Sequence, residues 1–210
     1  MTDLKNIGPT PTTYCLKMLR VFVVIVCITV VCCQNCPQFV KYSNNVGIMS
    51  NLKGTYYSTY TSTNPVYNCQ YVTYTVDENG ILTGTTGWPG CCMSLSDFDS
   101  TSDPLQVHYK IGLKSGTCSV KSGISDITSK FITAIGSGDN LCLMYTSCRD
   151  VQVGIYVICR QKLVPQSLLG EILILLKNLI DPVVLLLYGI PDLKAVSQTN
   201  CVFPANNCPS

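Results

Sequence analysis

Short apolar stretches alternate with turn residues between about residues 52 and 160. Tyr, Thr, Val and Ile dominate these stretches, and Gly, Asn, Asp and Ser separate them, which is a composition typical of strands and turns. Residues 105–111 alternate apolar with polar side chains, as a half-buried strand does. Residues 77–80, Asp-Glu-Asn-Gly, contain the Asn-Gly pair that most strongly predicts a hairpin.

The pattern predicts about eight short strands in series. We expect them at residues 52–61, 69–76 and 81–86, within 91–98, and at 105–111, 130–135, 141–148 and 153–159. Short strands joined by tight turns favour an up-and-down barrel or a sandwich. Residues 112–127 are expected to form a long loop before the sixth strand.

The periodicity changes after the last predicted strand. Residues 165 to about 188 are rich in Leu and Ile, with polar residues near helical spacing, and Pro165 suits an early helical position. The Asp181-Pro182 pair is expected to kink or divide the helix. A membrane span would contain three charged side chains, each costing about 3 kcal/mol at its centre. The pattern therefore favours an amphipathic helix that packs on the strands, and residues 194–210 are expected to form a loop.

The N-terminal segment has the features of a secretory leader. Lys17 and Arg20 precede an apolar run over residues 21–33, which is short of the roughly 20 residues that cross a bilayer. Such a run fits the core of a signal peptide. An uncleaved signal anchor, and Met18 as the true start, stay open. The predicted organisation is a signal peptide over 1–33 with cleavage near Cys33/Gln34, a domain over 34–201 and a tail over 202–210.

Charge and cysteine content narrow the class of protein. Outside the leader, eleven basic and eleven acidic residues balance, and no basic stripe indicates a nucleic-acid partner. Ten of the 14 cysteines follow the leader, and an even number in a secreted chain indicates disulfides and an extracellular location. No metal site is expected, because the one histidine is His108 and the one Cys-x-x-Cys pair, Cys33 with Cys36, straddles the cleavage site.

Several motifs in a fixed order carry a family resemblance. They are Cys36-Pro37, Leu-Lys-Gly-Thr-Tyr-Tyr at 52–57, the stretch 68–74 with the hairpin 77–80, Leu-Met-Tyr-Thr-Ser-Cys at 143–148, Ile-Cys-Arg at 158–160, and Gly-Ile-Pro-Asp at 189–192 with Gln198 and Cys201. In these residues the chain resembles the lipocalin family, and within it apolipoprotein D and the arthropod bilin-binding proteins most. The resemblance covers roughly residues 36–201.

The resemblance implies an all-β fold, an eight-stranded antiparallel up-and-down lipocalin barrel with a C-terminal α-helix packed outside. It also implies a secreted protein that binds and transports a small hydrophobic ligand, such as a fatty acid, a sterol, a retinoid or a bilin-type pigment. The chain departs from the family at Tyr56, where tryptophan is usual, and at residues 136–140, where the second family motif is reduced.

Gly54, Tyr56 and Arg160 are the expected barrel-closing residues. The Tyr56 ring is able to offer its face to Arg160 in a cation–π contact worth about 1 kcal/mol, and Gly54 permits close approach of the backbone. The alternative is that Tyr56 is one more strand aromatic and Arg160 a surface charge.

Two disulfides, Cys36–Cys148 and Cys69–Cys201, are implied by the resemblance. A third is predicted from register. If the last two strands turn at Asp150-Val151, Cys142 faces Cys159 on the outside and Tyr145 faces Tyr156 on the inside. A free, buried pair of cysteines stays open as an alternative. The remaining cysteines, Cys91, Cys92, Cys118 and Cys208, are not assigned. A bridge across the barrel mouth between Cys118 and the Cys91-Cys92 segment stays open.

Strand parity points a set of aromatic, aliphatic and hydroxyl side chains into the barrel. The predicted ligand-binding residues are Tyr60, Val72, Tyr74, Leu82, Thr86, Val107, Tyr109, Tyr145 and Tyr156. Such a lining is usual for a hydrophobic ligand, and eight strands leave room for about one small molecule. The alternative is a barrel filled by its own side chains.

Catalysis has little support in the sequence. His108 is expected on the outer face with no acidic neighbour in register, so we expect neither an enzyme nor a cofactor. Two other functions stay open: a secreted protein-binding or inhibitor protein that uses its loops, and a cysteine-based isomerase with a free thiol in the cavity.

Overall fold

The computed structural model describes residues 52–100, 105–118, 125–149, 152–179 and 192–203. The chain divides into two compact units, Met1–Asn35 and Cys36–Ser210, and the described residues all belong to the second. The predicted signal peptide and its cleavage site therefore lie outside the described residues, as do Asp181-Pro182 and most of the predicted C-terminal tail.

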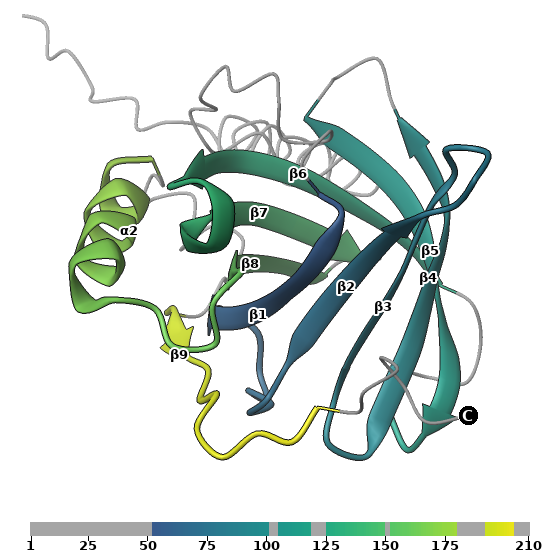
Figure 1. Ribbon diagram of the computed structural model, residues 1–210, viewed down its shortest axis with the longest axis horizontal. Coiled ribbons are helices and arrows are strands. Elements are labelled where there is room, and N and C mark those ends of the chain that lie inside the picture. Colours follow the sequence, from purple (N-terminus) through teal and green to yellow (C-terminus); the bar gives the residue numbers. More distant parts are fainter. Residues whose placement is uncertain (1–51, 101–104, 119–124, 150–151, 180–191, 204–210) are drawn as a thin grey trace, which may run out of the picture. The chain divides into compact units, whose positions relative to one another are not determined.

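Eight antiparallel strands within the described residues close into a barrel (Figure 1). They are β1 (Gly54–Thr61), β2 (Tyr71–Val76), β3 (Leu82–Trp88), β4 (Cys91–Ser100), β5 (Gln106–Gly116), β6 (Ser125–Ile135), β7 (Cys142–Arg149) and β8 (Gln152–Cys159). Each strand pairs with the next along the chain, and β1 pairs with both β2 and β8, so the eight strands form a closed ring. This up-and-down arrangement confirms the predicted lipocalin type of barrel rather than a sandwich.

Helix α2 (Gln166–Leu179) follows the barrel and lies outside it. Ile172 and Leu176, one turn apart, are buried against strands β6 to β8. With Leu168, Leu175 and Leu179 they form the apolar stripe expected of a surface helix. The helix starts where Pro165 predicts it, and residues 180–188 of the predicted helix lie outside the described residues.

The β7–β8 hairpin has the predicted register. Cys142 pairs with Cys159 and Tyr145 with Tyr156, and Cys142 and Cys159 form a disulfide with Sγ atoms 2.10 Å apart. Both cysteines belong to an outer cluster beneath α2, whose buried members are Ile132, Cys142, Met144, Ile155, Val157, Cys159, Ile172 and Leu176. The alternative of a free, buried pair of cysteines at positions 142 and 159 is therefore wrong.

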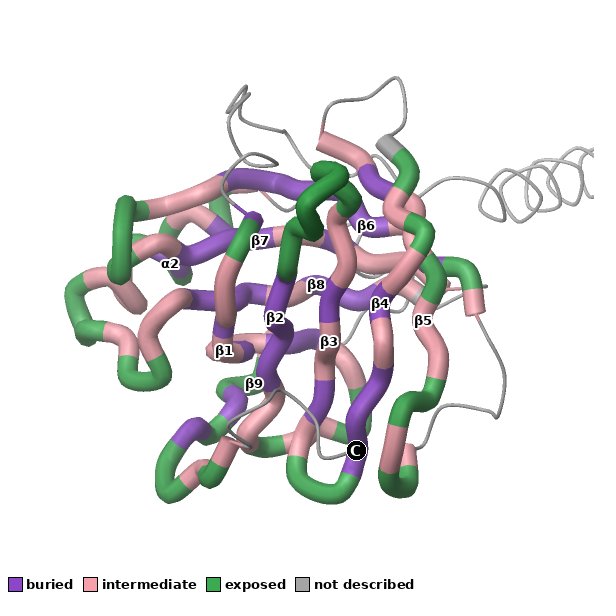
Figure 2. Tube along the Cα trace, turned by 45° about the vertical axis from the view of Figure 1, so that its right-hand side comes forward, coloured by how far each residue is buried: buried purple, intermediate pink, exposed green. Residues whose placement is uncertain are grey.

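A separate interior cluster fills part of the barrel. Its buried members are Leu52, Tyr56, Val72, Tyr74, Leu95, Val107, Phe131, Leu143 and Ile158. Figure 2 shows buried positions recurring along the strands, while the connections between them are mostly exposed. The same strands β7 and β8 therefore serve two apolar cores, one on each face.

The prediction of a long loop over residues 112–127 is wrong. Strand β5 continues to Gly116 and β6 begins at Ser125, and the end of β5 pairs with the start of β4. A disulfide between Cys91 and Cys118 ties the same two strands together. Backbone pairing with β4 extends β5 through residues whose side chains do not alternate, which is why the pattern missed it.

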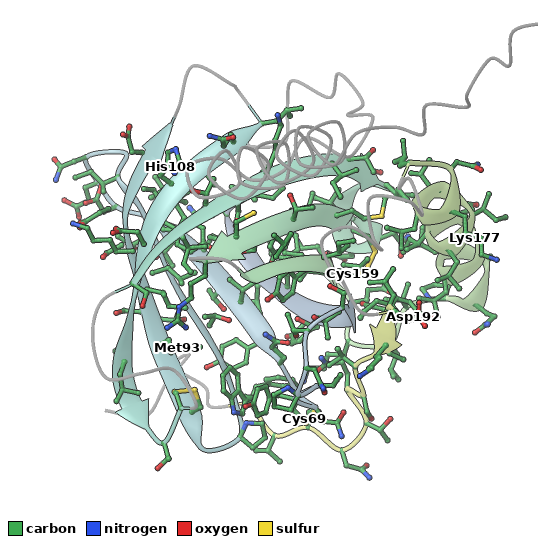
Figure 3. All side chains as sticks on the ribbon, turned by 180° about the vertical axis from the view of Figure 1, so that it is seen from behind. Cys69, Met93, His108, Cys159, Lys177 and Asp192 are labelled. Carbon is green, nitrogen blue, oxygen red and sulfur yellow. A yellow bond between two sulfur atoms is a disulfide. The ribbon has the colours of Figure 1, made fainter. Side chains whose placement is uncertain are left out.

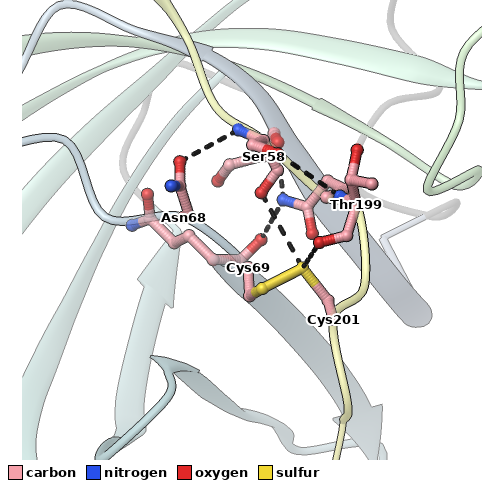
Figure 4. Close-up of a disulfide and its surroundings, with 8 residues drawn as sticks. Ser58, Asn68, Cys69, Thr199 and Cys201 are labelled. Atoms are coloured by element: carbon pink, nitrogen blue, oxygen red, sulfur yellow. Dashed lines mark hydrogen bonds between the residues drawn. A yellow bond between two sulfur atoms is a disulfide. The ribbon is translucent and has the colours of Figure 1, made fainter.

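The C-terminal tail carries a short strand where a loop was expected. Strand β9 (Lys194–Ala195) pairs with the end of β1. Beyond it, the Gln198 side-chain amide donates to the carbonyl oxygens of Ser58 (2.8 Å) and Gln70 (2.9 Å). Cys69 and Cys201 form the disulfide that the resemblance implies (Figure 4). The tail is thereby fastened to the outside of the barrel.

The predicted inward position of Tyr60 is wrong, because a β-bulge interrupts β1. Ser58 pairs with Ile158, but Tyr60 pairs with Val157, so β1 carries one residue more than β8 between these pairs. An extra residue reverses the alternation beyond it. Tyr60 therefore packs against the outer cluster, and its neighbour Thr61 is fully buried on the inner face.

We predict that Tyr60→Ala lowers the free energy of unfolding by about 2 kcal/mol, because it leaves a cavity beneath α2. Urea denaturation followed by circular dichroism measures the change. Leu163→Ala removes an apolar side chain that is 75% exposed, and it should alter stability by less than about 0.5 kcal/mol. Equal effects of the two substitutions would contradict the outward placement of Tyr60.

Candidate functional site

A cavity of about 410 Å³ lies inside the barrel. Apolar side chains of β2, β4, β5 and β6 form one side of it, namely Val72, Met93, Leu95, Ile111 and Ile127. Side chains of the β1–β2 connection and of the facing strand ends line its mouth, namely Thr63, Asn64, Pro65, Tyr67, Trp88 and Arg149. The Tyr67 and Trp88 rings stack there, with centroids 4.1 Å apart.

Most of the predicted ligand-binding residues line this cavity. They are Val72, Tyr74, Thr86, Tyr109, Tyr145 and Tyr156. Leu82 and Val107 also point inward, but they pack in the interior cluster and do not line the cavity. Tyr60 lies outside the barrel, as the bulge in β1 dictates.

Parity extended along correctly placed strands would have found several residues that the sequence analysis missed. Ser147 and Arg149 follow Tyr145 at intervals of two on β7, so they share its inward face. Met93 and Leu95 are likewise two residues apart on β4, and both line the cavity. The sequence analysis expected only a short strand there and did not say which of its residues point inward. Ile127 was missed because it fell in the predicted loop.

Four tyrosines meet inside the cavity, and their hydroxyl groups differ in their partners. Tyr109 shares a hydrogen bond of 3.1 Å with the Ser129 hydroxyl and also bonds the Ser147 side chain, and Tyr156 bonds Thr63. The hydroxyls of Tyr74 and Tyr145 have no hydrogen bond with any described residue. A polar group inside the barrel normally finds a partner, so these two hydroxyls are available to water or to a ligand.

Burial keeps these tyrosines neutral. Desolvation raises the pKa of Tyr156 to about 12 and those of Tyr74 and Tyr145 well above the ordinary value of 10. Neighbouring tyrosines raise the last two further. Desolvation also raises the pKa of Tyr109, while its bonds to Ser129 and Ser147 oppose the rise. The cavity therefore offers hydroxyl donors across the whole physiological pH range.

The opposite end of the barrel is closed by Tyr56 and Arg160. The guanidinium carbon of Arg160 lies 4.5 Å from the centroid of the Tyr56 ring. One of its Nη atoms donates to the Tyr56 hydroxyl at 3.1 Å and to the Lys53 carbonyl at 2.6 Å. Gly54 has a φ of +122°, and a Cβ there would clash with the Arg160 guanidinium. The contacts are those expected from the sequence, and they need glycine at position 54.

Catalytic and metal-binding groups are not evident in the described part of the chain. Asp99 pairs with His108 across β4 and β5, which corrects the expectation of no acidic neighbour in register, but no ion pair joins them there. His108 instead bonds the Thr128 hydroxyl through Nδ1 at 2.8 Å. Over the described ranges, no three His, Cys, Asp or Glu side chains gather in a way suited to a metal ion.

The eight described cysteines are all disulfide-bonded. Cys92 and Cys148 belong to this set, and the partner implied for Cys148, Cys36, lies outside the described residues, as does Cys208. The structure joins Cys91 to Cys118, a pair that the sequence left unassigned. None of these eight cysteines supplies a free thiol to the cavity.

Comparison with known proteins gives distant structural matches. No family model matches the sequence, and no curated protein matches it. A mutant of LTBP1 in complex with leukotriene C4 aligns with a TM-score of 0.49 and 13% identity over 78% of this chain and 97% of that chain. The cockroach major allergen Per a 4 has a TM-score of 0.45 and 16% identity over 79% and 94% of the two chains. Lobster apocrustacyanin A1 has a TM-score of 0.45 and 14% identity over 79% and 94%.

No helix within the described ranges has both the length and the apolar character that a bilayer crossing requires.

We predict that stability falls at alkaline pH through the cavity tyrosines. Between pH 10 and pH 12 the unfolded chain loses tyrosine protons that the folded chain keeps, so the free energy of unfolding decreases as pH rises. Tyr156 contributes a loss on the order of 2 kcal/mol by pH 12, and nothing below pH 10. Urea denaturation across pH 8–12 should show this decline, and Tyr156→Phe should make it shallower. A profile that is the same in both proteins would contradict the assignment.

Substitutions at the closed end should be coupled. We predict that Arg160→Met lowers the free energy of unfolding by about 2 kcal/mol and Tyr56→Phe by about 1 kcal/mol, since they remove hydrogen bonds and a cation–π contact. The double variant should lose less than the two single losses together, because both act on one contact. Lys177→Met, on the exposed side of α2 (Figure 3), controls for loss of charge. Strict additivity would contradict the direct contact.

Proposed function

We propose that this chain is a secreted carrier of the lipocalin kind, which holds one small hydrophobic molecule in its barrel and catalyses no reaction. The observation that carries the proposal is the cavity of about 410 Å³ within a closed barrel. Ligand pockets typically measure about 300–1,000 Å³ and combine an apolar lining with a few placed polar groups. This cavity has that size, and its lining combines apolar side chains such as Val72, Leu95 and Ile127 with polar groups of tyrosine, threonine and arginine.

The packing of the barrel favours a carrier over a filled structural domain. Side chains fill the region near Tyr56, but the region between Ile127 and Tyr156 is left open. An apolar molecule entering it would be stabilised by about 25 cal/mol for each Å² of apolar surface removed from water. The hydroxyls of Tyr74 and Tyr145 would orient it.

Secretion and the ligand class rest on the sequence. The leader-like segment and the disulfides support an extracellular protein. The resemblance to apolipoprotein D and to bilin-binding proteins supports a fatty acid, a sterol, a retinoid or a bilin-type pigment as the ligand class. A thiol-dependent isomerase has no support among the described cysteines, since all of them are in disulfides.

Binding of a protein partner is a second candidate, favoured by a groove on the outside of the barrel. The groove has a volume of about 430 Å³ and lies between the β3–β4 turn and the tail, lined among others by Tyr71, Trp88, Pro89, Val202 and Phe203. The Cys91–Cys118 disulfide stiffens its edge. We rank this candidate second because the cavity inside the barrel favours a carrier of a small molecule.

Trp88 allows a direct test of the carrier function. It is the one tryptophan of the chain and lines the cavity mouth, so a ligand that enters should change its fluorescence. Trp88 also lines the outer groove, so substitutions in the cavity wall decide which of the two sites is occupied. We predict saturable, one-to-one binding when purified protein is titrated with retinol, oleic acid, cholesterol and biliverdin in turn. Binding of none of the four, by folded protein first extracted with solvent, would contradict the carrier function and turn attention to the groove.

A matched pair of tyrosine substitutions locates the site. Tyr145→Leu alters the cavity wall, whereas Tyr60→Leu alters the outer cluster beneath α2. Both should lower stability, but we expect Tyr145→Leu alone to weaken binding, by about fivefold or more. Equal effects on affinity would place the ligand elsewhere.

A further inference from the structure

The inner face of β7 carries a polar row that runs towards the mouth of the cavity. Tyr145, Ser147 and Arg149 occupy it at intervals of two residues, and all three line the cavity. Tyr156 extends the row onto β8, since its ring stacks on Tyr145 with centroids 5.2 Å apart. The side of the cavity formed by Met93, Leu95 and Ile127 is apolar. The cavity is thus amphipathic across its width.

Arg149 gives the mouth a positive charge. It is half-buried, and within the described ranges it makes no ion pair. The described residues that line the cavity include no Asp, Glu or Lys, so Arg149 is the one charged group among them. Since no described residue of the lining supplies a carboxylate, the Arg149 guanidinium is able to attract an anionic group of a ligand and to bind it through two parallel hydrogen bonds.

The Tyr145 hydroxyl supplies a second polar contact for a ligand, besides Arg149. Like that of Tyr74, it has no hydrogen bond with any described residue, so it remains to be satisfied by whatever fills the cavity. Tyr145 and Arg149 are four residues apart on one face of a strand, so their Cα atoms are about 13 Å apart. Both side chains line the same cavity, so one elongated molecule is able to contact both.

We infer that the ligand is an anionic amphiphile: a long-chain carboxylate that carries a hydroxyl or keto oxygen along its hydrocarbon chain. The carboxylate pairs with Arg149 at the mouth, the oxygen bonds the Tyr145 hydroxyl, and the hydrocarbon lies against Met93, Leu95 and Ile127. This inference rests on the proposed function and narrows it to one chemical class. A sterol or retinol has a hydroxyl for Tyr145 but no negative charge for Arg149.

Four lipids test both contacts separately. Ricinoleic acid is a hydroxylated unsaturated fatty acid, oleic acid lacks its hydroxyl, and the methyl ester of each lacks the negative charge. We expect ricinoleic acid to bind the protein best by Trp88 fluorescence. Loss of the charge should weaken binding by about fivefold, and loss of the hydroxyl should weaken it by a similar factor.

Two variants assign these losses to residues. In Arg149→Gln, acid and ester should bind equally, and the affinity for the acid should no longer fall with added salt. In Tyr145→Phe, the hydroxylated and plain lipids should bind equally. Removing that hydroxyl breaks no hydrogen bond with a described residue, so the fold should be unaffected. The matched controls are Lys177→Gln on the exposed side of α2 and Tyr57→Phe on the outer face of β1, and both should keep the preferences of the unaltered protein.

The outcomes separate this inference from the proposed function. If the four lipids bind the unaltered protein with equal affinity, the inference is overturned and the carrier function stands. If none of them binds, the inference is overturned as well, and binding of retinol or cholesterol decides the carrier function independently. If acid and ester still differ in Arg149→Gln, the carboxylate lies elsewhere and the assignment to Arg149 is overturned.

Discussion

The pairing of β7 with β8 is the constraint on which both the Cys142–Cys159 disulfide and the cavity depend. Successive strand residues point to opposite faces, so the register that places Tyr145 opposite Tyr156 inside also places Cys142 opposite Cys159 outside. A slip of one residue would turn the cysteines into the cavity and the tyrosines outward, towards the helix. The Cys142–Cys159 disulfide makes that slip impossible once it has formed.

Stability and binding are assigned to different parts of the molecule. An open interior forfeits packing contacts that a filled core would make. The outer cluster beneath α2, the Cys69–Cys201 bond and the Tyr56–Arg160 closure offset this loss from outside the cavity. The barrel therefore keeps an amphipathic cavity beside the interior cluster that packs around Tyr56.

The sequence predicted the parts of the fold that follow from alternation and from motifs. The barrel-closing pair came from the family resemblance, since Tyr56 and Arg160 are 104 residues apart. The strand order, the helix after β8 and the third disulfide depend on patterns within single strands or on a strongly specified hairpin. Six cavity residues followed from the same parity. These features are local, which is why one sequence sufficed for them.

The features that the sequence did not predict depend on contacts between distant segments. The bulge that turns Tyr60 outward arises where β1 pairs with β8, about 100 residues later, and nothing in the local pattern marks it. The length of β5 depends on pairing with β4, and β9 forms only because β1 offers it an edge. Arg149 could have been found by extending the parity of Tyr145, but its role at the mouth depends on the closure of the barrel.

The central claim is that the barrel holds one hydrophobic molecule. Native mass spectrometry of the protein expressed through a secretory pathway, before and after extraction with organic solvent, tests it most directly. The account predicts a single added mass on each chain that extraction removes, with the chain still folded afterwards, and its identification in the extract as a lipid. A fully folded protein that carries no such mass, and acquires none when incubated with lipids, would contradict the account.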